Sequence, residues 1–212
     1  MFYKNFIKRP LDFILSLLLL ILVSPIFLAI MVLTRVKIGS PVFFSQERTG
    51  QYMKRFNIIK FRTMTDERDV NGNYISDEMR HTGFGDFLRS TSLDELPELL
   101  LIVEGEMSII GPRPLLPEYD PYYTEYERKR FNVRCGLIPP DSVDQSAIIS
   151  WDKQLQYEAD YANEVSFEND LRILLGVFKM LFKRRNTDYG KYIRKTLSEE
   201  RKAKKDIKQK LS

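Results

Sequence analysis

The longest apolar run of the chain lies near its N-terminus. From Phe13 to Leu33 the sequence carries no charged residue, and about 20 apolar residues are enough for a helix to cross the hydrocarbon core of a bilayer. No cleavage site made of small residues follows before Thr34 and Arg35, so the run does not resemble a removable signal peptide. We therefore expect a membrane segment that is retained.

Two features distinguish this segment from an ordinary crossing helix. Pro25 has no N–H group and its ring clashes with the preceding turn, so the helix should bend at Ser24-Pro25, where the Ser24 hydroxyl can bond a freed carbonyl. Lysines and arginines, which favour the cytoplasmic side, occur on both sides of the run. A re-entrant helix satisfies both ends, with Asp12 and the basic residues at the headgroups, and a kinked crossing helix is the alternative. The basic residues are Lys4, Lys8, Arg9, Arg35 and Lys37.

Beyond Gly39 the pattern changes to short apolar and aromatic runs. Two of them flank the polar stretch 48–51, which predicts a β-hairpin. The stretch DERDVNGNYISDE that follows is polar and contains Asn71-Gly72, so we expect an exposed loop with a turn there. Its acidic residues are too irregularly spaced for an EF-hand calcium site.

Helical patterns dominate the remainder of the chain. We expect helices from Asp94 to about Glu104, from about Pro117 to Phe131, and over 166–185 with Ser166 as its cap. The last of these is either a core helix or a helix in the plane of an anionic membrane surface. The charged tail from Lys195 to Ser212 is expected to be loose. The pattern divides the chain into a re-entrant anchor (1–36), a folded domain (37–185) and a charged C-terminal tail (186–212).

Composition narrows the possible chemistry. The 212 residues include 33 lysines and arginines against 29 acidic residues, a mildly basic balance that suggests an anionic partner without specifying nucleic acid or membrane. Cys135 is the single cysteine, which excludes an intramolecular disulfide and a cysteine-rich zinc site. His81 is the single histidine, and no Gly-x-Ser-x-Gly motif accompanies it, which argues against a Ser-His-Asp triad.

Asp94 and Glu95 are the strongest candidates for catalysis. Asp94 could simply cap a helix, and Ser92-x-x-Glu95 fits a capping box. Basic residues elsewhere favour a phosphoryl site: Arg113 is stiffened between two prolines, and the further candidates are Lys60, Arg62 and Arg89. A carboxylate can attack phosphorus to form an acyl phosphate, provided that arginines and a divalent ion offset the repulsion between the two anions.

Five stretches occur in a recognisable order: KRPLDFILSLLLLILVSPIF, VFFSQERTG, FNIIKFRTM, FLRSTSLDELPELLLIVEGEMSIIGPRPLLPEY and RFNVRCG. Together they resemble the bacterial sugar transferase family, the small monotopic phosphoglycosyl transferases that begin polyprenol-linked glycan assembly. The resemblance covers about residues 4–185. It implies an α+β fold in which a re-entrant membrane helix, broken at Ser24-Pro25, precedes a compact, mainly helical cytoplasmic catalytic domain with a small β-hairpin.

The resemblance also implies a two-step reaction at the cytoplasmic face of the bacterial inner membrane. Asp94 would attack a UDP-sugar, release UMP and hold the sugar phosphate covalently until undecaprenyl phosphate collects it, which initiates exopolysaccharide, capsule or glycoconjugate assembly. Glu95 would assist the nucleophile or the incoming acceptor phosphate, and Arg113 would bind phosphate, for which Arg89, Lys60 and Arg62 are the further candidates from the residues themselves. Mg²⁺ would be required, with Asp94 and the substrate phosphates as its ligands. Membrane lipids and later glycosyltransferases are the expected further partners, and nucleic acid is not.

One region departs from the family pattern. The family usually continues after Arg134-Cys135-Gly136 with a Gly-Trp-Ala-Gln-Val-Asn-Gly-Arg-like run, whereas this chain has LIPPDSVDQSAIISW, with Pro140 at the Trp and Ser146 at the Arg. Glu158 stands where the family usually has Asp. We interpret the divergent segment 137–148 as altered donor recognition. The alternatives are an inactive membrane scaffold that recruits glycosyltransferases and a single-pass anchored regulatory protein.

Overall fold

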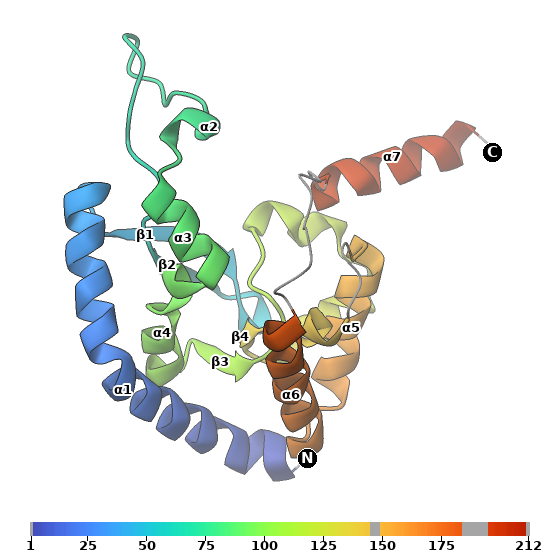
Figure 1. Cartoon of the computed structure of the whole chain (residues 1–212). Coiled ribbons are helices and arrows are strands. Elements are labelled where there is room, and N and C mark those ends of the chain that lie inside the picture. The colour runs from blue at the N-terminus through green and yellow to red at the C-terminus, as the bar shows by residue number, and fades with distance from the viewer. Residues whose placement is uncertain (1, 145–148, 184–194, 211–212) are drawn as a thin grey trace. The chain divides into compact units, whose positions relative to one another are not determined.

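The computed structural model describes residues 2–144, 149–183 and 195–210. The chain folds as two compact units, each assembled from separate stretches of sequence. The Asp94 unit comprises Pro10–Gln46 and Asn57–Met107, and the Arg113 unit comprises Met1–Arg9, Glu47–Phe56 and Ser108–Ser212. Figure 1 shows the elements of both.

Helices and short strands alternate along the chain, which confirms the expected mixture of helix and sheet. β1 and β2 form the predicted antiparallel hairpin. A second two-stranded sheet, β3–β4, and the helix α5 were not predicted. The elements are α1 (Lys8–Lys37), β1 (Phe43–Thr49), β2 (Arg55–Phe61), α2 (Asp77–Arg80), α3 (Gly83–Thr91), α4 (Glu98–Glu104), β3 (Met107–Ile110), β4 (Cys135–Ile138), α5 (Trp151–Asn163), α6 (Phe167–Lys183) and α7 (Leu197–Lys210), with a π-helical turn at Tyr3–Ile7 before α1.

α1 is one continuous helix that contains Pro25. Pro25 has no N–H group to offer the carbonyl of Ile21, and the Ser24 hydroxyl donates to that carbonyl instead, at 2.8 Å. The predicted compensation by Ser24 is therefore confirmed. Figure 1 shows that the helix axis changes direction part-way along α1, yet the helix does not separate into two. Its re-entrant course through a bilayer stays a prediction.

The exposure pattern of α1 is the reverse of that in a soluble protein. Large apolar residues such as Leu18 and Leu22 are exposed, whereas Asp12, Ser16 and Thr34 are buried. Among the described residues, α1 is also the one helix long and apolar enough to cross a membrane. An exposed apolar face on a long helix is expected where that face contacts lipid.

The base of α1 is held by protein contacts. Lys8 Nζ lies 2.7 Å from Oδ2 of Asp170 on α6, and the same oxygen accepts a hydrogen bond from the Tyr3 hydroxyl. Lys8 and Asp12 are both buried. A buried charge needs a partner, and Asp170 supplies one for Lys8. The location of Lys8 and Asp12 at the lipid headgroups stays a prediction.

The core of the Asp94 unit joins α1, β2 and α3. Ile30, Phe61 and Leu88 are buried together, and apolar residues of α1 and α3 pack around them. At Gly85 the main chain of α3 approaches β2's continuation so closely that an added Cβ would lie 1.9 Å from the carbonyl oxygen of Thr63. Only glycine fits this contact, which places α3 beside the end of β2.

The loop between β2 and α3 is exposed, as predicted. Asn71-Gly72 forms the expected turn: Gly72 has a φ of +82°, and Asp69 Oδ1 accepts from the N–H groups of Asn71 and Asn73, each at 2.9 Å. In Figure 1 this loop projects beyond α3 and carries α2.

Two apolar clusters form the core of the Arg113 unit. One surrounds Trp151 and Leu155, and the other surrounds Ile110, Tyr161 and Ile173. The helix predicted from Pro117 to Phe131 is wrong, because two 3₁₀ segments, Pro117–Tyr122 and Glu127–Asn132, replace it. Pro121 removes an N–H group inside this stretch, and the chain becomes extended at Tyr123.

The helices at the C-terminal end are partly as predicted. Ser166 caps α6, because its hydroxyl accepts from the N–H of Asn169 at 3.2 Å. The expectation of a loose tail is wrong for the described residues, since α7 is helical and Leu197 is fully buried in the Trp151 cluster. Leu197 binds the start of this helix to the core, which the charged composition of the tail did not reveal.

Candidate active site

Asp94 and Glu95 lie in a short 3₁₀ turn (Leu93–Glu95) between α3 and α4. Ser92 ends α3 in the left-handed conformation, with a φ of +56°. Within the described residues, neither this turn nor α4 has a side-chain capping bond at its start, and α4 begins only after Pro97. The capping interpretation of the two carboxylates is therefore wrong, and the turn presents them at a half-buried position.

Lys60 of β2 contacts the acidic segment directly. Its Nζ lies 2.6 Å from Oε1 of Glu95 and 3.4 Å from Oε1 of Glu98. Glu98 is buried, with a side chain that is 5% exposed, whereas that of Glu95 is 24% exposed. Lys60 therefore holds Glu95 and offsets two negative charges next to Asp94.

The surroundings of Asp94 raise its pKa above the usual value. Burial is the main cause, and the charge of Glu95 adds to it, while the charges of Lys60 and Arg89 oppose it. A carboxylate with a raised pKa is more basic than an exposed one. This property is suited to a nucleophile and ties its activity to pH.

Arg89 of α3 is exposed beside this segment. Its Nε donates to the Thr63 hydroxyl at 2.9 Å, and its Nη1 lies 3.2 Å from Nε2 of His81. Because arginine only donates, Nε2 accepts and Nδ1 of His81 carries the proton, which it donates to Asp86 at 3.0 Å. This contact between His81 and a candidate phosphate ligand was not predicted from the sequence.

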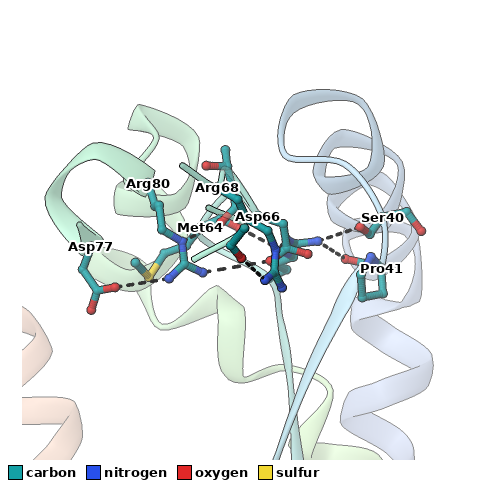
Figure 2. A network of polar contacts seen from close by, with 10 residues as sticks. Ser40, Pro41, Met64, Asp66, Arg68, Asp77 and Arg80 are labelled. Carbon is teal, nitrogen blue, oxygen red and sulfur yellow. Dashed lines mark hydrogen bonds and ion pairs between the residues drawn. The ribbon is translucent and has the colours of Figure 1, made fainter. Parts of the chain in front are cut away.

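Arg62 has a different environment from the other candidate phosphate ligands. Its side chain is buried and donates to the carbonyl groups of Ser40, at 2.7 Å, and Met64, at 2.9 Å. It also pairs with Asp66, which lies 4.0 Å from Arg80. Figure 2 shows this network joining the end of α1 to the projecting loop. Its contacts with the chain indicate a structural role for Arg62.

Arg113 belongs to the Arg113 unit and is exposed, whereas Gly111 and Pro112 before it are buried. The N–H of Gly136 donates to the carbonyl of Pro112 at 2.9 Å. A Cβ at Gly136 would lie 2.0 Å from the main chain of Gly111, so the two segments can lie this close only because position 136 is glycine. The Gly-Pro-Arg-Pro loop therefore presents an exposed guanidinium from a fixed backbone.

The side chains around Asp94 fit a magnesium site in which substrate phosphates supply part of the ligands. Among the described residues, no three acidic, histidine or cysteine side chains are grouped as a protein cage for a metal. Asp94 and Glu95 offer two adjacent carboxylates. Mg²⁺ is commonly held by one or two carboxylates together with substrate phosphates, and this donor set belongs to that class.

Comparison with known proteins identifies the family. The model of the family described as bacterial sugar transferase matches residues 3–184. The chain belongs to this family. It is 44% identical over 176 residues to the uncharacterized sugar transferase EpsL of Bacillus subtilis, covering 82% of this chain and 87% of EpsL.

Two further relatives carry more specific names. The exopolysaccharide production protein ExoY of Sinorhizobium fredii is 31% identical over 191 residues, which cover 82% of this chain and 83% of ExoY. The UDP-glucose:undecaprenyl-phosphate glucose-1-phosphate transferase of Klebsiella pneumoniae is 34% identical over 185 residues, which cover 81% of this chain and 39% of that protein. The chain therefore spans about two fifths of the length of this last sugar transferase.

The residues predicted from the sequence to form the site are divided between the two units. Lys60, Arg89, Asp94 and Glu95 lie in the Asp94 unit with direct contacts among some of them, and Arg113 is part of the other unit. Ser146 of the divergent segment lies outside the described residues. Glu98 was not singled out, although it follows the acidic pair in the sequence and shares its lysine.

Proposed function

We propose that this sugar transferase moves a sugar 1-phosphate from a UDP-sugar to undecaprenyl phosphate and releases UMP. The observation that carries the proposal is the half-buried Asp94, which has a raised pKa and caps no helix. The undecaprenyl-phosphate transferase named among the relatives supports the same substrate classes. The outward-facing apolar residues of α1 support a membrane location, which we propose to be the inner membrane with the catalytic residues on the cytoplasmic side.

In the proposed reaction Asp94 supplies the nucleophile. A carboxylate oxygen forms a bond to the phosphorus that carries the sugar, and the bond from that phosphorus to the UMP oxygen breaks, so the electron pair leaves with UMP. A phosphate oxygen of undecaprenyl phosphate then attacks the same phosphorus and releases the carboxylate. Asp94 is regenerated, and each step exchanges one P–O bond for another.

The neighbouring residues have supporting roles in this proposal. Lys60 keeps Glu95 in place, and Glu95 assists the entry of the acceptor phosphate. Arg89 and Arg113 bind phosphate oxygens, for which a planar guanidinium is well suited. Asp94 and Glu95, with the substrate phosphates, would hold Mg²⁺, which draws negative charge from the phosphoryl oxygens when bound.

The test is turnover followed by capture of the intermediate. Membranes that contain the protein are supplied with undecaprenyl phosphate, Mg²⁺ and a panel of UDP-sugars, and UMP release is measured. With labelled donor and no acceptor, we expect label that survives denaturation, is lost to hydroxylamine, and maps to the peptide that contains Asp94. No turnover with any donor would favour a non-catalytic scaffold that recruits glycosyltransferases, and label on another residue would overturn the role of Asp94.

A further inference from the structure

The Arg113 unit contains a fully buried ion pair that the proposed reaction does not use. Nε of Arg130, on the 3₁₀ segment Glu127–Asn132, lies 2.8 Å from Oε2 of Glu158 on α5. The two side chains are 1% and 0% exposed. A fully buried ion pair is unusual, because the free energy of removing two charges from water often exceeds the free energy gained from their attraction.

Both members of the pair contact the main chain of Arg113. Oε1 of Glu158 accepts the N–H of Arg113 at 3.1 Å. From the other side, Nη2 of Arg130 donates to the carbonyl of Arg113. Nη1 of Arg130 donates to the Tyr123 hydroxyl at 3.0 Å. Nε of Arg130 and Oε2 of Glu158 face each other as an ion pair without forming a hydrogen bond.

We propose that Arg130 and Glu158 are positioning residues for Arg113. The proposal rests on the proposed role of Arg113 as a phosphate ligand. Together the two side chains fix both peptide groups of Arg113, and Pro112 and Pro114 restrict the backbone on either side. The exposed Arg113 side chain therefore extends from a restrained backbone, so less conformational freedom is lost when its guanidinium binds an anion.

Arg130 stays charged over the working pH range. Burial by itself works to lower the pKa of Arg130, but the charge of Glu158 and the adjacent Tyr123 outweigh it and hold that pKa above its usual value. A permanently ionised Arg130 keeps donating to the carbonyl of Arg113. An apolar pair could fill the same space, but it could not bond the N–H and the carbonyl of one loop residue.

The experiment separates positioning from stability. Full-length protein in detergent carries Asp94→Asn so that bound donor is not consumed, and calorimetry measures the Kd of a UDP-sugar that the wild type turns over. The double variant Arg130→Met/Glu158→Leu removes both charges and keeps apolar volume in the core. We expect Kd to rise by up to about tenfold, which corresponds to the cost of ordering one long side chain.

A matched control removes another ion pair from the same 3₁₀ segment. Glu127 pairs with Arg201, and its other oxygen accepts the N–H of Thr124; these bonds do not involve Arg113. We expect Glu127→Gln/Arg201→Met to change the thermal midpoint and leave Kd unchanged. In contrast, Arg113→Ala should raise Kd about tenfold or more, because a hydrogen bond to a charged group is lost.

The decisive comparison adds Arg113→Ala to the double variant. If the pair acts through Arg113, the combined variant binds donor no more weakly than Arg113→Ala alone. Additive losses, or an unchanged Kd in a folded double variant, overturn the proposal. Should the double variant unfold, Arg130→Lys replaces it, since it keeps the charge beside Glu158 but lacks the fork that reaches the Arg113 carbonyl.

The same measurements distinguish this proposal from the proposed function. An unchanged Kd in Arg113→Ala removes Arg113 from the donor site, and the positioning role with it, while labelling of Asp94 still tests the reaction. Protein that binds and turns over no UDP-sugar contradicts both proposals.

Discussion

Replacing Lys60 by methionine tests how the acidic pair is supported. Lys60 Nζ lies 2.6 Å from Glu95 and 3.4 Å from Glu98, and the lysine side chain is 20% exposed. Removing one partner of a buried pair costs about 3–5 kcal/mol, whereas an exposed pair contributes at most about 1 kcal/mol. Glu98 is buried and Glu95 is not, so we expect a loss at the lower end of the buried range, about 3 kcal/mol.

Urea unfolding in detergent, followed by far-ultraviolet circular dichroism, measures this loss. The control is Lys60→Met combined with Glu98→Gln, which removes the buried carboxylate that has lost a cation and should recover most of the stability. The reasoning is refuted if Lys60→Met unfolds at the same urea concentration as the wild type, or if the second substitution recovers nothing.

The same lysine should affect the pH dependence of turnover. Asp94 must be ionised to attack, so activity is lost as pH falls through its raised pKa. Lys60 opposes that rise, and Lys60→Met should therefore move the acidic limb of the activity profile to higher pH. Glu95 contributes to the rise, so the residual activity of Glu95→Gln should have its acidic limb at lower pH. Shifts in the same direction, or no shift, contradict this account.

Three further substitutions address the nucleophile, the membrane helix and the fold. Asp94→Asn should reduce turnover by orders of magnitude, and full activity of the variant would exclude Asp94 as the nucleophile. Because the pKa of Asp94 is raised in the folded protein, its ionised form opposes folding above pH 3.8. The variant should therefore be at least as stable as the wild type at neutral pH. Ser24→Ala with Pro25→Ala should straighten α1, and accessibility labels at both termini in intact cells test this, with unchanged topology counting against the kink. Gly85→Ala would place a Cβ 1.9 Å from a main-chain oxygen and should cost about 3 kcal/mol in urea unfolding, whereas Gly83→Ala, which meets nothing within 4 Å, should be tolerated; equal stability of the two would contradict the close contact.

Local signals in the sequence predicted several elements correctly. The aromatic runs around Thr49 predicted the β1–β2 hairpin, Asn71-Gly72 predicted the turn in the exposed loop after β2, and Ser166 predicted the start of α6. The β3–β4 sheet was missed because its strands are only four residues long and lie far apart in the chain. The helix expected across Pro121 was wrong because the prediction relied on the spacing of apolar residues, although Pro121 has no N–H group for a helical hydrogen bond.

The candidate site was predictable in its residues and not in its contacts. The motif around Asp94 and the prolines beside Arg113 identified those side chains. No spacing rule shows that Arg62 is bonded to carbonyl groups or that His81 bonds Arg89, because these contacts depend on how a loop folds back. Glu158 was noticed only as a departure from the family pattern, and its contact with Arg113 joins residues 45 positions apart.

Leu197 shows that the folded core of this protein extends beyond the segment that matches the family. The family match stops at residue 184, yet Leu197 fills part of the core beside Trp151 and Tyr119. Shortening the protein at the edge of the match would uncover these aromatic rings and favour aggregation in place of a minimal enzyme. Trimming for crystallisation, and grafting of the catalytic region onto other anchors, should therefore keep the chain at least through the first turn of α7.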